Sequence, residues 1–446
     1  MRLLQSLSNF LARVPDREFQ MAAPERAATD PHPASARHSG HIRARQRLAE
    51  IFTPTQPLSR KNFYPQEGRC GEAFVGRNAE RDRIIRALVE ERAHVVIYGE
   101  RGRGKTSLAN LALAHADTAV FDVARYICSA DSDFDAITRG LLQDLPRWSS
   151  GSRWFGTPPP AGPDPHDDAT TPPPSRAVQL GDILAQVEFR RGSRLLFVVD
   201  EFDRVVDENT RTAMADMIKQ CSDRGMPLSF MIIGVSDSVE QLLGRHPSIQ
   251  RCVARIALPL LSHAEVELIV ARGEEAGLDL PKPARSCIAQ LARGVPYMAQ
   301  LLALRAGQAA LDDGRTRIRG DDLIAAVRAA AAEADPRIRT LYNTATGLER
   351  DAAALGVLRA AALGPQDEFG RFRVDICGSF LRVAGAQVDP AAWRRVIASG
   401  AIRAVRGGEP DLYTFGEAMM PHFVLQRAVL SRQTAGTTPS RGDAPM

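Results

Sequence analysis

The fold is decided by the stretch Tyr98-Gly99-Glu100-Arg101-Gly102-Arg103-Gly104-Lys105-Thr106-Ser107. It matches the phosphate-binding loop pattern G-x-x-x-x-G-K-[ST] at every fixed position. Glycines in such a loop allow successive backbone N–H groups to point at one anion. The lysine places a positive charge beside the β- and γ-phosphates of a nucleotide, and the threonine hydroxyl is a ligand for Mg²⁺. The pattern therefore predicts that residues 99–107 bind nucleotide phosphates, with Lys105 as a catalytic residue and Thr106 as a metal ligand.

The sequence on both sides of this loop fits a strand–loop–helix unit. The apolar run His94-Val95-Val96-Ile97-Tyr98 is typical of a buried strand, and residues 106–113 open a helix. A helix N-terminus favours negative charge, so the loop and the helix are expected to act together on a phosphate group. A chance glycine-rich turn would not need this context, and we therefore favour the phosphate site.

Four further apolar segments predict strands of the same sheet: residues 119–124, 194–200, 228–235 and 253–258. Continuous apolar runs are typical of parallel strands that are buried on both faces. The strands alternate with helical patterns, and this alternation predicts helices on both sides of one parallel sheet. The expected fold class is therefore α/β, a parallel-sheet sandwich of three layers.

Composition divides the rest of the chain into segments with different expected structures. The first 62 residues hold ten basic and five acidic side chains without sustained periodicity, which is typical of disorder, although a short helix is expected near residues 47–52. Residues 1–20 either belong to the native chain or precede a start at Met21. We expect a disordered basic extension at 1–62, an α/β core at 63–260 with a Pro-rich flexible insertion at 149–175, a helical lid at 261–335, a winged-helix-like domain at 336–432 and a disordered tail at 433–446.

Overall composition excludes several classes of protein. The six cysteines include no C-x-x-C pair, which indicates reduced thiols rather than a disulfide framework or a zinc site. No apolar run approaches the roughly 20 residues that cross a bilayer. The net charge is +4, and its surplus lies in the N-terminal extension. The basic run at residues 43–47 either touches nucleic acid or forms a solvated helix face, and charge alone does not decide between them. We expect a cytoplasmic protein without a membrane partner.

A second acidic motif follows the predicted strand at residues 194–200. Asp200 and Glu201 end this strand, at the edge where a parallel sheet presents ligand contacts. An aspartate at this position can hold Mg²⁺ opposite Thr106, and the adjacent glutamate can polarise a water for attack on the γ-phosphate. We therefore expect Asp200 as a metal ligand and Glu201 as the catalytic base, while Asp203 is expected to support them or to lie at the surface.

The chain resembles the P-loop ATPases of the AAA+/STAND type, and its layout is similar to the origin-recognition and archaeal replication-initiator branch. The resemblance covers residues 72–430 and is carried by the phosphate loop, Asp200-Glu201-Phe202-Asp203, Val75-Gly76-Arg77 and Ile233-Gly234-Val235-Ser236-Asp237. It implies a P-loop NTPase core with a helical lid and a C-terminal winged-helix-like domain. It also implies ATP and Mg²⁺ as cofactors, and Val75, Gly76 and Arg77 as part of the nucleotide site.

The same resemblance suggests residues that sense the nucleotide. The position after the fourth strand is either Ser236 or Asp237, and the serine is the better candidate because a carboxylate repels phosphate. The lid presents Gly294-Val295-Pro296-Tyr297, in which Pro296 resembles the Gly-x-Pro of STAND switches. An arginine acting on a neighbouring copy is either Arg251 or Arg255, and a structural ion pair is an equally good account of both.

Four arginines of the C-terminal segment could meet DNA phosphates: Arg394, Arg395, Arg403 and Arg406. The alternative is that the segment packs on the ATPase body as a switch element, because a fold does not establish a function. The expected function is an ATP-binding and slowly hydrolysing switch. Its partner is either double-stranded DNA, in an initiator-like or transposition-helper role, or a protein or second copy, in signalling or defence.

Overall fold

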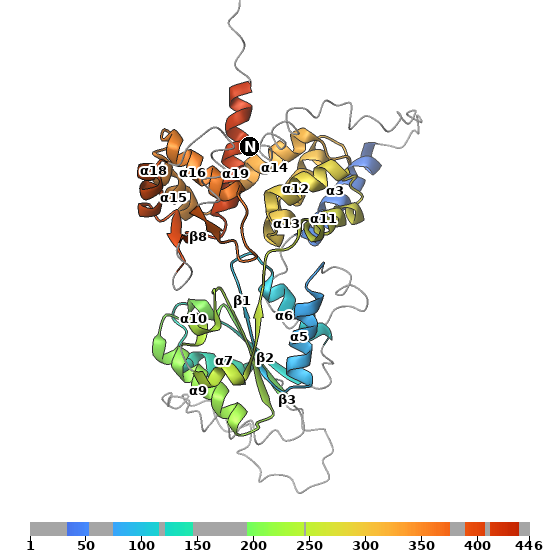
Figure 1. The fold of residues 1–446 in the computed structure, drawn as a ribbon. Coiled ribbons are helices and arrows are strands. Elements are labelled where there is room, and N and C mark those ends of the chain that lie inside the picture. Colours follow the sequence, from blue (N-terminus) through green and yellow to red (C-terminus); the bar gives the residue numbers. More distant parts are fainter. Residues whose placement is uncertain are drawn as a thin grey trace, which may run out of the picture.

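The computed structural model describes residues 34–52, 75–115, 121–145, 194–244, 247–374, 389–405 and 411–436. Figure 1 shows an α/β body below and a mainly helical body above, joined where strand β1 and the connection after strand β5 approach the upper body. The insertion expected at 149–175 lies outside the described residues. Within those residues no helix is long and apolar enough to cross a membrane.

The lower body is built on one parallel sheet of five strands, as the sequence predicted. Its strands are β1 (His94–Tyr98), β2 (Phe121–Ile127), β3 (Arg194–Asp200), β4 (Leu228–Gly234) and β5 (Val253–Ala257). Their order is β2-β3-β4-β1-β5. Tyr98 lies opposite both Gly234 and Ala257, so the carboxyl ends of the three strands meet at one edge. This edge carries the phosphate loop.

Helices cover both faces of the sheet and give it two separate hydrophobic cores. The helices on one face are α5 (Asn78–Val89) and α6 (Lys105–His115), and those on the other are α7 (Phe134–Asp144), α9 (Glu208–Asp223) and α10 (Val239–Leu243). Side chains that alternate along β1 and β3 supply the two cores in turn, since Val96 faces one and Val95 the other. The three-layer α/β class is therefore confirmed.

The lid consists of four main helices within residues 261–335. They are α11 (His263–Ala271) with the short η3 (Arg272–Ala276), α12 (Lys282–Ala292), α13 (Pro296–Asp312) and α14 (Gly320–Ala332). A capping box of Ser262 and Glu265 begins α11. Pro296 begins α13, where its missing N–H costs no hydrogen bond.

The C-terminal unit, residues 336–436, combines helices with a small antiparallel sheet. Its elements are α15 (Pro336–Thr346), α16 (Ala352–Leu363), β6 (Phe372–Arg373), α18 (Pro390–Ala398), β7 (Ile402–Ala404), β8 (Leu412–Phe415) and α19 (Met420–Gly436). Strands β7 and β8 form an antiparallel hairpin, with β6 on the other side of β8. Residues 375–388, which follow β6 and Val374, lie outside the described residues.

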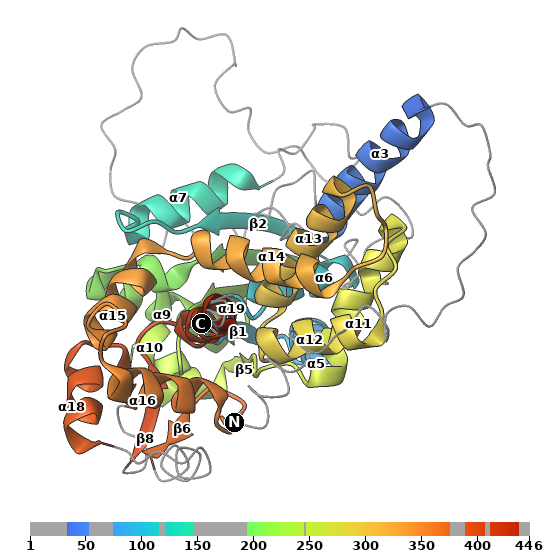
Figure 2. The same ribbon diagram turned by 90° about the horizontal axis from the view of Figure 1, so that it is seen from above.

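Helix α19 joins the C-terminal unit to the lid. Figure 2 places it near the middle of the upper body, beside α14. One hydrophobic core contains Leu291 of the lid, Tyr342 of α15 and Phe423 of α19. The expected boundary at residue 336 is therefore not a break in the core. The tail expected at 433–446 is also partly wrong, because α19 runs to Gly436.

The N-terminal extension was predicted to be disordered over residues 1–62 apart from a short helix near residues 47–52. The structure confirms that helix and contradicts the predicted disorder for residues 34–46. Residues 34–52 form helix α3 (Ala34–Phe52), which packs against α13 and η3 of the lid. Leu48 is fully buried and Phe52 is 1% exposed in the lid core. A hypothetical Cβ at Gly307 would lie 2.6 Å from Leu48 Cδ2, and one at Gly273 would lie 3.3 Å from Phe52 Cε2. The two glycines thus form sockets for α3.

Replacing Phe52 by alanine tests whether α3 is part of the folded protein. Because the ring fills a lid socket, we expect the change to lower the free energy of unfolding by about 3–5 kcal/mol. Urea denaturation followed by circular dichroism measures the loss. Gln46, on the exposed side of the same helix, provides the control Gln46→Ala, with an expected change below about 0.5 kcal/mol. Equal small effects of both substitutions would contradict the docking of α3.

Candidate functional site

The phosphate loop connects β1 to α6 and takes the conformation that its glycines permit. Gly99, Gly102 and Gly104 have φ angles of 141°, 82° and 86°. Residues other than glycine rarely adopt such angles. A Cβ at Gly104 would meet no atom within 4 Å, whereas one at Gly102 would lie 2.6 Å from Met419 Cε. The loop is therefore open at Gly104 and covered at Gly102 by the C-terminal unit.

Lys105 is buried at the first position of α6 and points back along the loop. Its Nζ donates hydrogen bonds to the carbonyl oxygens of Gly99, at 2.9 Å, and Glu100, at 3.0 Å. Burial lowers the pKa of Lys105 to about 8, although the carboxylates of Asp203, Glu100 and Asp200 oppose this shift. A lysine with a pKa this close to neutrality can still carry its charge to a phosphate at physiological pH.

The two predicted metal ligands lie against each other. Thr106 Oγ1 donates to Asp200 Oδ2 at 2.8 Å, so the hydroxyl of α6 meets the carboxylate at the end of β3. Burial raises the pKa of Asp200, while hydrogen bonds from Thr106 and the Glu201 amide oppose the rise. Among the described residues no three His, Cys, Asp or Glu side chains could hold a metal by themselves. A hydroxyl and one carboxylate do fit Mg²⁺, which usually takes its other ligands from phosphate and water.

Glu201 has an unusual backbone and a side chain that is already paired. Its φ is 54° and its ψ 36°, in the left-handed region. Its Oε2 accepts a hydrogen bond of 2.8 Å from Arg204 Nη1, and both side chains are at least half exposed. The carboxylate expected to act on water is thus held by an arginine three residues away.

Asp203 has a structural role that the sequence analysis did not resolve. Its Oδ1 accepts a hydrogen bond of 2.7 Å from the Val235 amide, so the loop after β3 is tied to the end of β4. A Cβ at Gly234 would lie 3.1 Å from the Asp203 amide nitrogen, and only glycine leaves room for this approach. The acidic run after β3 was the available signal, but the partner strand could not be identified from it.

The two expected sensor residues after β4 differ in environment. Ser236 is buried, and its Oγ lies 2.7 Å from the Ser238 carbonyl oxygen and 3.0 Å from Gln241 Oε1. Asp237 is exposed. Burial raises the pKa of Glu100, and the negative charge of Asp237 raises it further. Ser236 therefore organises its own turn in this structure.

The remaining sensor candidates fall into two groups. Pro296 starts α13 directly above the phosphate loop, where the next amide, of Tyr297, donates to the Gly102 carbonyl oxygen at 3.3 Å. Arg251 ends the short η2 (Pro247–Arg251) and is exposed, while Arg255 pairs with Glu240 at 3.4 Å. Only Pro296 is thus brought to the loop.

Val75, Gly76 and Arg77 link α5 to the start of the lid. Arg77 is 6% exposed, and its guanidinium donates to Glu80 and to the Pro259 carbonyl oxygen. A Cβ at Gly76 would lie 2.6 Å from Glu265 Oε1. The segment therefore packs beside the connection between β5 and α11, next to the nucleotide edge of the sheet.

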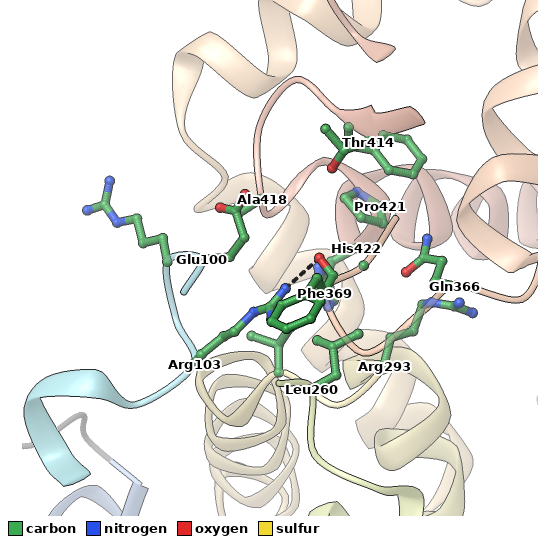
Figure 3. A pocket seen from close by; sticks show the side chains of 14 residues that line it. Glu100, Arg103, Leu260, Arg293, Gln366, Phe369, Thr414, Ala418, Pro421 and His422 are labelled. Atoms are coloured by element: carbon green, nitrogen blue, oxygen red, sulfur yellow. Dashed lines mark hydrogen bonds between the residues drawn. The ribbon is translucent and has the colours of Figure 1, made fainter. Parts of the chain in front are cut away.

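Arg103 was expected only as a loop residue, but its side chain makes polar contacts between the two bodies. The side chain is buried, and Nη1 donates to the carbonyl oxygens of Leu258, at 2.8 Å, and Glu368, at 3.2 Å. Nη2 donates to the Phe369 carbonyl oxygen at 2.8 Å (Figure 3). An arginine of the phosphate loop thus binds the turn that precedes β6.

The turn that receives Arg103, residues 367–370, is held in shape by Asp367. The Asp367 carboxylate accepts hydrogen bonds from the amides of Phe369 and Arg371, and the Glu368 carbonyl oxygen also accepts from the Leu260 amide at 2.8 Å. The turn is therefore bonded both to the phosphate loop and to the connection between sheet and lid. The signal in the sequence was the arginine at a variable position of the loop pattern.

The arginines considered for DNA binding are partly engaged within the protein. Arg395 forms an ion pair of 2.7 Å with Asp351, and the Arg403 guanidinium donates to the Gly416 carbonyl oxygen. Arg394 is exposed, with Nε donating to the Pro390 carbonyl oxygen at 3.2 Å. Arg406 lies outside the described residues.

A parallel sheet, a phosphate loop and a threonine–aspartate pair at the sheet edge define the class of P-loop nucleotide-binding proteins. Residues 87–243 match the family described as AAA domain, which confirms the expected resemblance to the AAA-type P-loop proteins over this part of the chain. No curated protein matches the sequence.

Three solved structures are similar to this chain. Cdc6p from Pyrobaculum aerophilum is 14% identical with a TM-score of 0.44, and the match covers 85% of this chain and 99% of that one. The Aeropyrum pernix ORC2 protein is 14% identical with a TM-score of 0.45, and the match covers 84% of this chain and 99% of that one. A Walker-type ATPase of Pyrococcus abyssi is 14% identical with a TM-score of 0.47, and the match covers 83% of this chain and 99% of that one.

The lowered pKa of Lys105 predicts how nucleotide affinity depends on pH. Bound phosphates favour the charged lysine, so the pKa rises on binding and affinity is greatest below the free-state pKa of about 8. Above it we expect ATP affinity to fall by about tenfold per pH unit until the pKa of the complex is reached. Fluorescence titration with an ATP analogue measures this slope. Lys105→Arg keeps its charge and should lose the slope; a flat profile for the wild-type protein would be the contrary result.

Replacing Arg103 by alanine tests the contact between the bodies. Hydrogen bonds to a charged group contribute about 1.5–3 kcal/mol, so we expect amide exchange in residues 366–374 to accelerate about 10- to 100-fold. Hydrogen–deuterium exchange with mass spectrometry measures it. Arg101→Ala removes the exposed neighbouring arginine of the same loop and serves as the control. Unchanged exchange in Arg103→Ala would show that other contacts hold the turn.

Proposed function

We propose that the chain is a slow, Mg²⁺-dependent ATPase that works as a nucleotide-dependent switch, with the upper body as its moving part. The observation that carries the proposal is Arg103, which belongs to the phosphate loop and yet binds the C-terminal unit through two carbonyl oxygens. A loop that reshapes itself around phosphates moves the base of this side chain. Nucleotide state and the position of the C-terminal unit are then coupled.

The residues at the sheet edge can divide the chemistry among them. The loop amides and Lys105 hold the β- and γ-phosphates, and Lys105 would exchange its bonds to the Gly99 and Glu100 carbonyl oxygens for bonds to phosphate. Bound Mg²⁺ would be held by Thr106 and Asp200 and would supply charge neutralisation for the phosphates. Glu201 orients and polarises the attacking water.

Slow turnover is supported by two features of the same edge. The ion pair between Glu201 Oε2 and Arg204 makes the carboxylate a weaker base for water than a free one. Ser236 is occupied by Ser238 and Gln241 and offers its hydroxyl to its own turn. Faster catalysis therefore needs a rearrangement of both loops, as in enzymes whose conformational steps limit the rate.

A protein partner is the better-supported output of the switch. Release of the turn at 367–370 would uncover surface of the C-terminal unit that now contacts the loop, for example Met419 beside Gly102. The contacts of Arg395 and Arg403 within the protein give less support to double-stranded DNA. We therefore propose assembly with a protein, or with a second copy of the chain, as the response to ATP.

The proposal predicts a specific effect of Glu201→Gln. Loss of the base should lower phosphate release at least about 100-fold, while ATP still binds because Lys105 and Thr106 are unchanged. A coupled phosphate-release assay and a nucleotide titration measure the two properties. Glu208→Gln neutralises an exposed carboxylate at the start of α9 and should leave both unchanged. Undiminished phosphate release by Glu201→Gln would refute the assigned base.

A further inference from the structure

His94 is a buried histidine of the lower body that no step of the proposed ATPase uses. Its side chain is 2% exposed, although the ring carries two nitrogen atoms that need hydrogen-bond partners. It is the first residue of β1, whereas the phosphate loop follows the last residue of the same strand (Figure 1). The surroundings of the ring are therefore separate from the nucleotide edge of the sheet.

The ring of His94 binds backbone groups of two other elements. Its Nδ1 accepts a hydrogen bond of 3.0 Å from the Phe230 amide of β4. Its other nitrogen, Nε2, donates to the backbone carbonyl oxygen of Ile218 in α9. The ring also packs against the Phe230 ring, with 5.6 Å between the centroids. Both hydrogen bonds are possible only for the neutral ring with its proton on Nε2.

The backbone of His94 adds a third connection at the same corner of the sheet. Its amide donates to the Cys252 carbonyl oxygen, just before β5, at 3.0 Å. Pairing of β1 with β4 begins one residue later, at Val95 and Met231, so the ring extends this junction by one hydrogen bond. One residue thus joins the beginnings of β1, β4 and β5 to α9.

A proton on Nδ1 is incompatible with this arrangement. The imidazolium ring has two N–H donors and no acceptor, so Nδ1 would then face the N–H donor of Phe230. Strand β4 has no titratable side chain. The titratable side chains nearest in sequence to the other two partners are Lys219, Cys221 and Cys252, and no charged group among the described residues contributes to the pKa shift of His94. Nothing in the described surroundings thus compensates the protonated ring.

We propose that His94, with the Phe230 amide and the Ile218 carbonyl oxygen, is an acid-sensitive lock of the lower body. Near pH 7 the neutral ring ties α9 and β4 to the start of β1, and protonation releases this corner of the sheet. The lock goes beyond the proposed ATPase function, because it lies at the opposite end of β1 from the phosphate loop and requires no nucleotide.

The direction of the pH dependence follows from the burial of the ring. Burial lowers the pKa of His94 from 6.5 to about 4, and the hydrogen bond to Ile218 opposes this shift. The stabilisation by the neutral ring is therefore complete above pH 6.5 and is lost as the pH falls from 6.5 to about 4.

Hydrogen–deuterium exchange of the full-length protein at pH 7 and pH 5 tests the lock. After correction for intrinsic exchange rates, we expect opening of residues 214–232 to increase about 20-fold, as the two pKa values of His94 require. His94→Gln keeps an amide oxygen and an NH₂ group for hydrogen bonds but does not titrate, so its increase should be below about twofold. His263→Gln removes an exposed histidine of the lid and should keep the full increase.

Two further measurements keep the test decisive. Burial also lowers the pKa of His422 to about 4, but this residue lies in α19, so exchange of residues 420–436 reports its titration separately. If His94→Gln does not fold, His94→Asn replaces it, and an NMR titration of the wild-type His94 ring should give a midpoint near pH 4.

An acid-induced opening of residues 214–232 that persists in the His94 variants would overturn the lock, as would a His94 ring that titrates near pH 6.5 in the folded protein. Phosphate release at pH 7 should be unchanged in His94→Gln, whereas Glu201→Gln should lose it. Failure of the lock is thereby distinguished from failure of the proposed ATPase function.

Discussion

The arrangement of the two bodies depends on one buried guanidinium. Arg103 is 3% exposed and gives its hydrogen bonds to the end of β5 and to the turn before β6. The cost of burying the charge is offset only while those carbonyl oxygens stay in place. Since the loop pattern leaves this position free, the arginine is a property of this chain rather than a requirement of phosphate binding. The phosphate loop of this chain therefore also holds the C-terminal unit against itself, through Arg103.

The single core of the upper body determines what can move. Leu48 of α3, Leu291 of the lid and Phe423 of α19 belong to the same hydrophobic core, whereas the sheet has two cores of its own. Packed cores resist deformation, so the lid, α3 and the C-terminal unit would be displaced together. The connection after β5, residues 258–261, is the segment at which such a displacement would be taken up. The bonds of Arg103 and of the Leu260 amide cross this junction.

Local patterns predicted the elements whose stability is local. The five strands are apolar runs, the phosphate loop is a motif, and Asp200 ends a strand, so each was visible within about ten residues. Only the last residues of helix α3 were predicted. Its full length and its docking were missed because its burial depends on Gly273 and Gly307, more than 200 positions further along the chain. The roles of Arg103 and Asp203 were missed for the same reason, since their partners are carbonyl or amide groups of distant segments. Backbone groups leave no trace in a residue pattern.

The left-handed backbone of Glu201 has a consequence for how this chain can change. A residue other than glycine in the left-handed region of φ and ψ stores roughly 1–3 kcal/mol of strain, which a glycine would release. Selection for a more stable fold would therefore favour loss of the carboxylate, and only a need for its chemistry would retain it. Descendants that have abandoned nucleotide turnover but keep the architecture should be recognisable by glycine or asparagine at this position, beside an intact phosphate loop.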